Sequence, residues 1–297
     1  MTRLRGTWAA TAAVALFLIS ACARTADGAS AGSAAPPSSS GKSTADPDSL
    51  VLRVEQNGGF VPPEVLSGRI PSVSIYADGR VITLGPQIAI YPGPALPNLQ
   101  VQRIPLATVD ALVAKGVAAG VKTGADLGQP GVTDIPTTRI TVVTAAGPQV
   151  VDVDALNEAR PDDPNLTAAQ HAARAKLAAF VRQLSEPPAA ADLPEQQAYQ
   201  ATTIAALTRP YVNGSGDLPK PPAAVAWPGP TLPGAYLNEG TKLGCVSVTG
   251  AAATTLTDAA AKANAATPWT SGGKQWSVTF RPMLPDETDC ADLKAAR

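Results

Sequence analysis

Very few side chains of this 297-residue chain could act as nucleophiles, bases or soft metal ligands. It contains one histidine, His171, and three cysteines, Cys22, Cys245 and Cys290. Zinc sites draw several ligands from His and Cys, and a Ser-His-Asp site needs a correctly held histidine. His171 falls on the polar side of an expected helix, so we expect it to face solvent. These side chains therefore predict no catalytic residue, no metal and no cofactor.

Two short segments are similar to patterns found in penicillin-recognising enzymes. Ser271-Gly-Gly-Lys274 matches Ser-x-x-Lys, and Lys122-Thr-Gly124 matches Lys-Thr-Gly. Their order along the chain is the reverse of that family's order. The family places its nucleophilic serine at the start of a helix, where Gly-Gly would be unfavourable. We interpret the Ser271 segment as a turn before a strand.

The densest group of acids could offer oxygen ligands to a hard cation. Its members are Asp152, Asp154, Asn157, Glu158, Asp162 and Asp163. A calcium loop of EF-hand type needs alternating acids around a central glycine, which this segment lacks. A solvated strand end is the simpler interpretation, with a calcium site as the alternative. Two acids from distant segments could also meet in a cleft and serve glycoside hydrolysis.

The first residues carry a targeting pattern. Arg3 and Arg5 precede an uncharged apolar run from Gly6 to Ala21, which is shorter than the roughly 20 residues that span a bilayer. The run ends Leu18-Ile19-Ser20-Ala21-Cys22 and resembles the lipobox of bacterial lipoproteins. The resemblance implies that residues 1–21 are a signal peptide. It also implies that Cys22 is acylated, with palmitate among the expected chains, and becomes the first mature residue.

Lipidation would place the protein on the outer face of the cytoplasmic membrane, held by Cys22, because two or more acyl chains give stable anchoring. The following residues, 22–47, are small and polar, so we expect a disordered tether. Such a tether reaches about 80 to 90 Å when fully stretched. The abundance of Ala, Pro and Gly resembles uncharacterised lipoproteins of high-GC Gram-positive (actinobacterial) species.

The two remaining cysteines suit an oxidising compartment. If Cys22 carries lipid, Cys245 and Cys290 form an even pair, and a disulfide is the natural interpretation. It would attach the C-terminal segment to the strand expected at Cys245. A reactive thiol pair is the alternative, although the spacing is not that of a C-x-x-C motif.

Charge composition removes one class of partner. The chain has 23 Lys and Arg residues against 24 Asp and Glu residues, so no strong positive field favours nucleic acid. We therefore predict no nucleic-acid partner.

Patterning predicts an α+β fold of mostly antiparallel sheets and packed helices. We expect an N-terminal α+β domain over 48–187 and a C-terminal one, holding the disulfide, over 195–297, separated by a Pro-rich hinge at 186–195. The expected strands are 50–55, 72–76, 80–83, 137–144, 149–154, 201–207, 243–249 and 276–282. The expected helices are 108–119, 168–184 and 254–265, with apolar stripes Val109, Leu112, Val113, Val117 and Ala173, Leu177, Phe180, Val181, Leu184 on the first two. Asp78-Gly79 indicates a tight hairpin turn, and Thr167 with Gln170 indicates a capping box.

An aromatic-Pro-Gly-Pro-x-Leu-Pro motif occurs twice, starting at Tyr91 and at Trp227. It suggests that the two halves are related by duplication, with chance recurrence as the alternative. Exposed aromatics in loops often serve recognition. Tyr91, Trp227 and Trp269 are therefore the candidate binding surface. The competing interpretation is that each ring packs over its neighbouring prolines.

These observations favour a non-enzymatic, lipid-anchored, extracytoplasmic protein with a binding or envelope-assembly role. The expected partners are the membrane, through Cys22, and an envelope protein or cell-wall ligand. Two alternatives stay open. One is a cell-wall or peptide hydrolase that uses carboxylates, and the other is a protease inhibitor that uses the Pro-rich loop from Tyr91 to Pro97.

Overall fold

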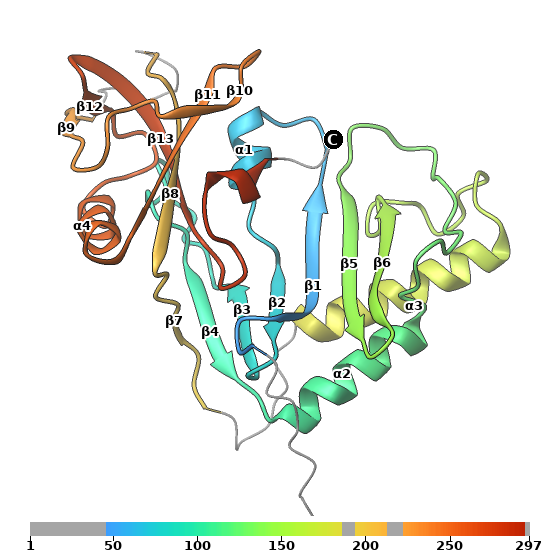
Figure 1. Cartoon of the computed structure of the whole chain (residues 1–297). Coiled ribbons are helices and arrows are strands. Elements are labelled where there is room, and N and C mark those ends of the chain that lie inside the picture. The colour runs from blue at the N-terminus through green and yellow to red at the C-terminus, as the bar shows by residue number, and fades with distance from the viewer. Residues whose placement is uncertain (1–45, 186–193, 213–221, 295–297) are drawn as a thin grey trace, which may run out of the picture. The chain divides into compact units, whose positions relative to one another are not determined.

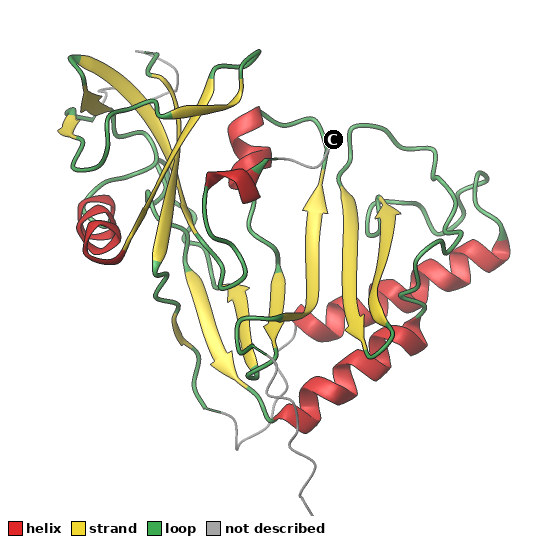
Figure 2. Ribbon diagram, viewed as in Figure 1, coloured by secondary structure: helices red, strands yellow, loops and turns green. Residues whose placement is uncertain are grey.

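The computed structural model describes residues 46–185, 194–212 and 222–294, and within them it contains two sheets and four α-helices (Figures 1 and 2). The α+β class expected from the sequence is confirmed. Residues 44–297 group as one compact unit. The expected signal peptide, Cys22, most of the expected tether and most of the expected hinge lie outside the described residues.

The first sheet has seven antiparallel strands in the order β6-β5-β1-β2-β3-β4-β7. They are β1 (Leu50–Asn57), β2 (Val73–Tyr76), β3 (Arg80–Leu84), β4 (Leu99–Arg103), β5 (Thr137–Thr144), β6 (Gly147–Asp154) and β7 (Gln197–Ala198). Gly79 takes the positive φ angle, +85°, that the β2–β3 turn requires. Alternate residues of β1, such as Leu52 and Val54, are buried, as the period of a strand dictates.

Two helices, α2 (Leu106–Ala119) and α3 (Ala168–Ser185), cover one face of this sheet (Figure 1). The capping box is present at the start of α3, since Thr167 N–H donates to Gln170 Oε1 at 2.8 Å and Gln170 N–H to Thr167 Oγ1 at 3.2 Å. Gly120, in the left-handed region, ends α2. A further short helix, α1 (Pro63–Gly68), was not expected from the sequence.

Both helices depart from their expected apolar stripes. On α2, Val117 is 49 % exposed, and Gly116 is buried next to it. On α3, the buried set includes Arg174, which the stripe omits. A pattern of apolar residues marks a face of the helix, but the neighbouring elements decide how much of that face is covered.

The second sheet has six strands in the order β10-β11-β8-β13-β12-β9, with only β12 and β9 parallel. They are β8 (Thr203–Pro210), β9 (Val225–Ala226), β10 (Ala235–Asn238), β11 (Leu243–Thr249), β12 (Trp269–Ser271) and β13 (Lys274–Pro282). Helix α4 (Gly250–Ala260) packs against it (Figure 1). The expected helix 254–265 is therefore misplaced at both ends. Residues 264–266 form a turn instead of continuing the helix, and in it Asn264 Oδ1 accepts from Ala266 N–H at 3.0 Å.

Segments distant in sequence hold the unit together. The carboxylate of Asp286 contacts Arg53 Nη2 at 2.7 Å and accepts from the Tyr76 hydroxyl at 2.8 Å, on the face of the first sheet opposite α2 and α3. Glu64 of α1 receives two hydrogen bonds from Arg209 of β8, at 2.7 and 2.8 Å. Charge-assisted hydrogen bonds of this kind are stronger than those between neutral groups.

Candidate ligand-binding cleft

The structure separates the three aromatic residues of the expected binding surface. Tyr91 is 68 % exposed, whereas Trp227 is 9 % exposed and Trp269 is fully buried. Trp269 and Phe280 lie edge to face with ring centroids 5.5 Å apart, and Trp227 meets Trp269 at 5.6 Å in the same geometry. Trp227 and Trp269 are thus core residues of the second sheet, so their proposed role as exposed binding residues is wrong.

The position of Trp227 agrees with the competing interpretation, because its ring packs on its own proline motif. Its indole Nε1 donates to the Pro230 carbonyl at 2.7 Å, and a Cβ added at Gly229 would stand 3.0 Å from the ring. A buried indole needs such a hydrogen-bond partner. The two copies of the motif differ, because the aromatic residue is buried in one and exposed in the other.

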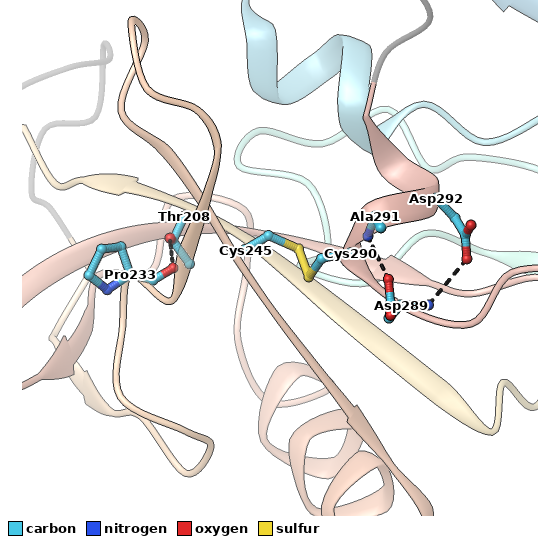
Figure 3. Close-up of a disulfide and its surroundings, with 7 residues drawn as sticks. All are labelled: Thr208, Pro233, Cys245, Asp289, Cys290, Ala291 and Asp292. Atoms are coloured by element: carbon cyan, nitrogen blue, oxygen red, sulfur yellow. Dashed lines mark hydrogen bonds between the residues drawn. A yellow bond between two sulfur atoms is a disulfide. The ribbon is translucent and has the colours of Figure 1, made fainter.

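Cys245 of β11 and Cys290 form a disulfide with their Cα atoms 6.0 Å apart (Figure 3). Cys290 begins the 3₁₀ helix η1 (Cys290–Leu293), whose start is capped by Asp289, since Ala291 N–H donates to Asp289 Oδ1 at 2.6 Å. The bond attaches η1 to the second sheet, as the cysteine count predicts.

His171 is half-buried rather than facing solvent, because its Nε2 lies 3.1 Å from the Asp163 carbonyl oxygen. The nearby acids do not converge: Asp152 pairs with Arg139, Asp154 accepts from Thr137, and Asp163 accepts from two backbone N–H groups. Those N–H groups, of Asn165 and Gly131, lower the pKa of Asp163. Within residues 46–185, 194–212 and 222–294, no group of three or more His, Cys, Asp or Glu side chains could hold a metal ion.

A cleft of about 930 Å³ lies between α2, α3 and the end of the β5–β6 hairpin, whose ribbons Figure 1 shows side by side. Cavities of this size fall within the range of small-molecule sites. Its larger apolar lining residues are Val113, Val117, Val121, Leu127 and Leu177, joined by several alanines. The half-exposed Val117 lies on this cleft, which accounts for an apolar side chain in contact with water.

Helices α2 and α3 contact each other beside the cleft. Gly116 lies against Phe180 there, and the absence of a side chain lets the helices approach closely. Asp110, Val113 and Val117 of α2, three and four residues apart, line the opening. Residues at this spacing share one face of a helix.

Polar groups at the rim of the cleft are few. Lys122, Asp110 and Asp126 line it together with Thr144 and Gln149. Asp126 is engaged, since its Oδ1 accepts from Gln170 Nε2 at 2.9 Å and from Gly128 N–H at 3.1 Å. Gln149 Oε1 accepts from Thr123 N–H at 3.3 Å and so attaches the loop after α2 to the hairpin. An apolar interior with a sparse polar rim is typical of sites for apolar or amphiphilic ligands.

Arg174 of α3 attaches the helix to neighbouring segments, one of which carries the cleft residue Leu127. Its guanidinium is buried and donates to the carbonyls of Asp154 at 2.5 Å and Ala155 at 2.9 Å, and more weakly to Leu127 at 3.4 Å. Burial lowers its pKa, while the charges of Asp154 and Asp163 act in the opposite direction. A single cation therefore joins α3 to the loop that carries Leu127.

A second cleft of about 630 Å³ lies on the other side of the contact between α2 and α3, over β2, β3 and β4. Its apolar walls include Ile75, Val81, Leu84, Ile104 and Leu112. It is bordered by Ser185 and Gln196, which flank the undescribed residues 186–193. We therefore base the candidate site on the first cleft.

Sequence reasoning missed the cleft. The expected apolar stripes place Val113, Val117 and Leu177 on the buried faces of their helices, and Gly116, near the C-terminal end of α2, is the one local signal of a close approach between helices.

Comparison with protein-family models, curated proteins and solved structures found no match. Among the described residues, none of the helices is long and apolar enough to cross a membrane.

Proposed function

We propose that this protein is a lipid-anchored, extracytoplasmic binding protein that takes an apolar ligand, such as the acyl chain of an amphiphile, into the cleft between α2 and α3. The observation that carries the proposal is the chemistry of the cleft wall, where five large aliphatic side chains surround about 930 Å³. Removing an acyl chain from water stabilises the complex by about 25 cal/mol per Å² of apolar surface buried. The anchor at Cys22 would keep the cleft near a source of lipids.

The hydrolase and inhibitor alternatives receive less support from the described residues. Of the two acids that line the cleft, Asp126 is committed to Gln170 and the Gly128 backbone. In the loop that an inhibitor would insert into a protease, Ala95 and Leu96 pack against the core of the second sheet. That packing leaves only the beginning of the loop projecting.

Ligand binding is tested with a fluorescent fatty acid titrated into the protein. Val117→Arg places a charge at the mouth of the cleft, where burial of the charge by a bound chain is costly, so we expect affinity to fall about tenfold or more. The matched control is Ala118→Arg, an exposed position one residue further along α2 that does not line the cleft. No binding by the parent protein, or equal losses for both variants, would contradict the proposed ligand site.

Anchoring is tested separately in cells. The Cys22→Ala variant should leave the membrane fraction and should not incorporate labelled palmitate, because the acceptor thiol is absent. Equal membrane retention and labelling in both proteins would contradict a lipid anchor at Cys22. The two experiments are independent, since the cleft can be titrated in protein of either form.

A further inference from the structure

We propose that the loop from Gln87 to Tyr91 is a second membrane contact, which inserts its side chains into the surface of a phospholipid bilayer. This surface is distinct from the cleft and does not depend on a ligand there. Ile88 is 61 % exposed, Ile90 59 % and Tyr91 68 %. Three large apolar side chains presented to water by one short loop form a patch that a soluble protein does not need for folding.

The loop is held in shape, so its apolar side chains do not simply fold back onto the protein. At its base, Gly85 N–H donates to the Asn98 carbonyl at 2.7 Å, and Asn98 Nδ2 donates to the Pro86 carbonyl at 2.8 Å. Further along, Ala265 N–H donates to the Gly93 carbonyl at 2.9 Å. A loop fixed at both ends loses little conformational entropy when its tip becomes buried.

The chemistry of the loop fits a lipid surface. No charged residue occurs from Val81 to Gln102, so insertion would not require removal of a charge from water. Isoleucine side chains partition into the acyl region, and a tyrosine places its ring at the headgroup level with its hydroxyl in water. A protein partner or a second copy of this chain would also cover apolar residues, and the experiment below separates these occupants.

The position of the loop is compatible with an anchor at Cys22. Arg80 Nη2 donates to the Pro47 carbonyl at 3.1 Å, so the described chain begins beside the first residue of β3. The loop starts just after the other end of β3, about 13 Å away at the usual rise per residue of a strand. The chain between Cys22 and Asp46 can span several times that distance, so the anchor leaves the loop free to reach the bilayer.

The first test uses residues 44–297, the compact unit, which lacks both Cys22 and the apolar N-terminal run. Its partition onto vesicles of phosphatidylcholine, and onto an equal mixture with phosphatidylglycerol, is measured by co-sedimentation. We expect binding to both, with a partition coefficient about tenfold lower for the combined Ile88→Ser, Ile90→Ser and Tyr91→Ser variant. The control is Phe60→Ser, an 89 % exposed aromatic outside this loop, which should bind like the parent.

The second test reports depth in the lipidated protein. A Tyr91→Trp variant reconstituted into vesicles of brominated phosphatidylcholine should show quenching of the added indole, whereas Tyr236→Trp, on β10, should show none.

Failure of the parent unit to bind either vesicle, an unchanged partition coefficient in the triple variant, or an unquenched residue 91 would overturn the proposal. So would a concentration-dependent dimer that the triple variant abolishes, which would assign the loop to a second copy. Because the triple variant leaves the cleft intact, unchanged fatty-acid binding by it separates this proposal from the proposed function.

Discussion

Gly116 of α2 lies directly against the Phe180 ring of α3, so that a Cβ atom added at Gly116 would stand 3.0 Å from Phe180 Cζ. The same atom would lie 2.9 Å from a methyl group of Val142 on β5. Both distances are shorter than the 3.5 to 4.0 Å at which carbon atoms pack favourably. The place where helix, helix and sheet meet therefore has room for a hydrogen atom and nothing larger.

Gly116→Val should lower the free energy of unfolding by about 2 kcal/mol. The free-energy cost of overpacking at this position exceeds the stabilisation gained by replacing a glycine within a helix. Ala118→Val, at an exposed position of the same helix, should change it by no more than about 0.5 kcal/mol. Urea unfolding of both variants measures the difference. The double variant Gly116→Val, Phe180→Leu should lose less stability than the sum of the losses in the two single variants, because leucine is smaller than phenylalanine and relieves the contact with position 116. Additive losses of stability would argue against a direct contact between positions 116 and 180.

Arg174→Ala should destabilise the protein by about 2 to 4 kcal/mol, because it removes a buried guanidinium that donates to the carbonyls of Asp154 and Ala155, of which Ala155 keeps a second donor in Ala159 N–H. It should also weaken fatty-acid binding, since Leu127 then loses part of its attachment to α3. Lys176→Ala, an exposed position of the same helix, is the control for both thermal unfolding and titration. Equal stability of the two variants would mean that the guanidinium is not needed to hold this loop.

The two copies of the aromatic-proline motif should respond differently to truncation. Trp227→Ala removes a ring packed against Trp269 and Phe280, so we expect a loss of about 3 to 5 kcal/mol in unfolding free energy. Tyr91→Ala should change stability by no more than about 0.5 kcal/mol, because the ring is exposed. Equal effects at the two positions, measured by denaturant unfolding, would contradict the distinction between core and surface.

Replacing both Cys245 and Cys290 by Ala should cost about 2 to 5 kcal/mol, because the bond closes a loop with a sequence separation of 45. Loss of the bond frees η1 from β11, so hydrogen exchange should rise first in residues 283–294. Cys22→Ala is the matched control and should leave both measurements as they are in the parent. Unchanged exchange in 283–294 would show that Asp286 and its partners hold this segment without the disulfide.

Features determined by a few neighbouring residues could be predicted from the sequence. Asp78-Gly79 forms a turn because glycine adopts a positive φ at little cost, and Thr167 with Gln170 forms a capping box through contacts three residues apart. Neither depends on the rest of the chain. The α+β class follows in the same way from local patterns of period 2 and period 3.6.

Features determined by distant neighbours could not be predicted. Trp227 sits in a loop segment, and only the arrival of Trp269 and Phe280 from other strands makes it a core residue. A cleft likewise depends on how far two helices diverge, and the spacing of Val113 and Val117 is the same whether or not another element covers them. Arg174 is buried because three backbone carbonyls from other segments surround it, and nothing beside it in the sequence indicates them.

Stability should fall steeply between pH 10 and pH 12, in part through Tyr199. Burial raises the pKa of Tyr199 from its ordinary value near 10 to about 12, and its hydroxyl donates to the Met283 carbonyl at 3.0 Å. Below pH 10 the phenol is protonated in both folded and unfolded chains, so its contribution is complete. Between pH 10 and 12 the unfolded chain releases the proton while the folded chain keeps it, which favours unfolding. Burial also raises the pKa of Tyr76, which acts in the same direction.

Tyr199→Phe should therefore cost about 1 kcal/mol at pH 8, through the lost hydrogen bond, and should lose less stability than the parent on going to pH 11. Urea unfolding at the two pH values measures both effects, and Tyr91→Phe, which alters an exposed ring, should follow the parent. Parallel losses in Tyr199→Phe and the parent would show that this hydroxyl is not the group responsible. The loss of stability between pH 8 and pH 11 that remains in the Tyr199→Phe protein should be smaller in a double variant that also carries Tyr76→Phe, because the second buried phenol then no longer titrates.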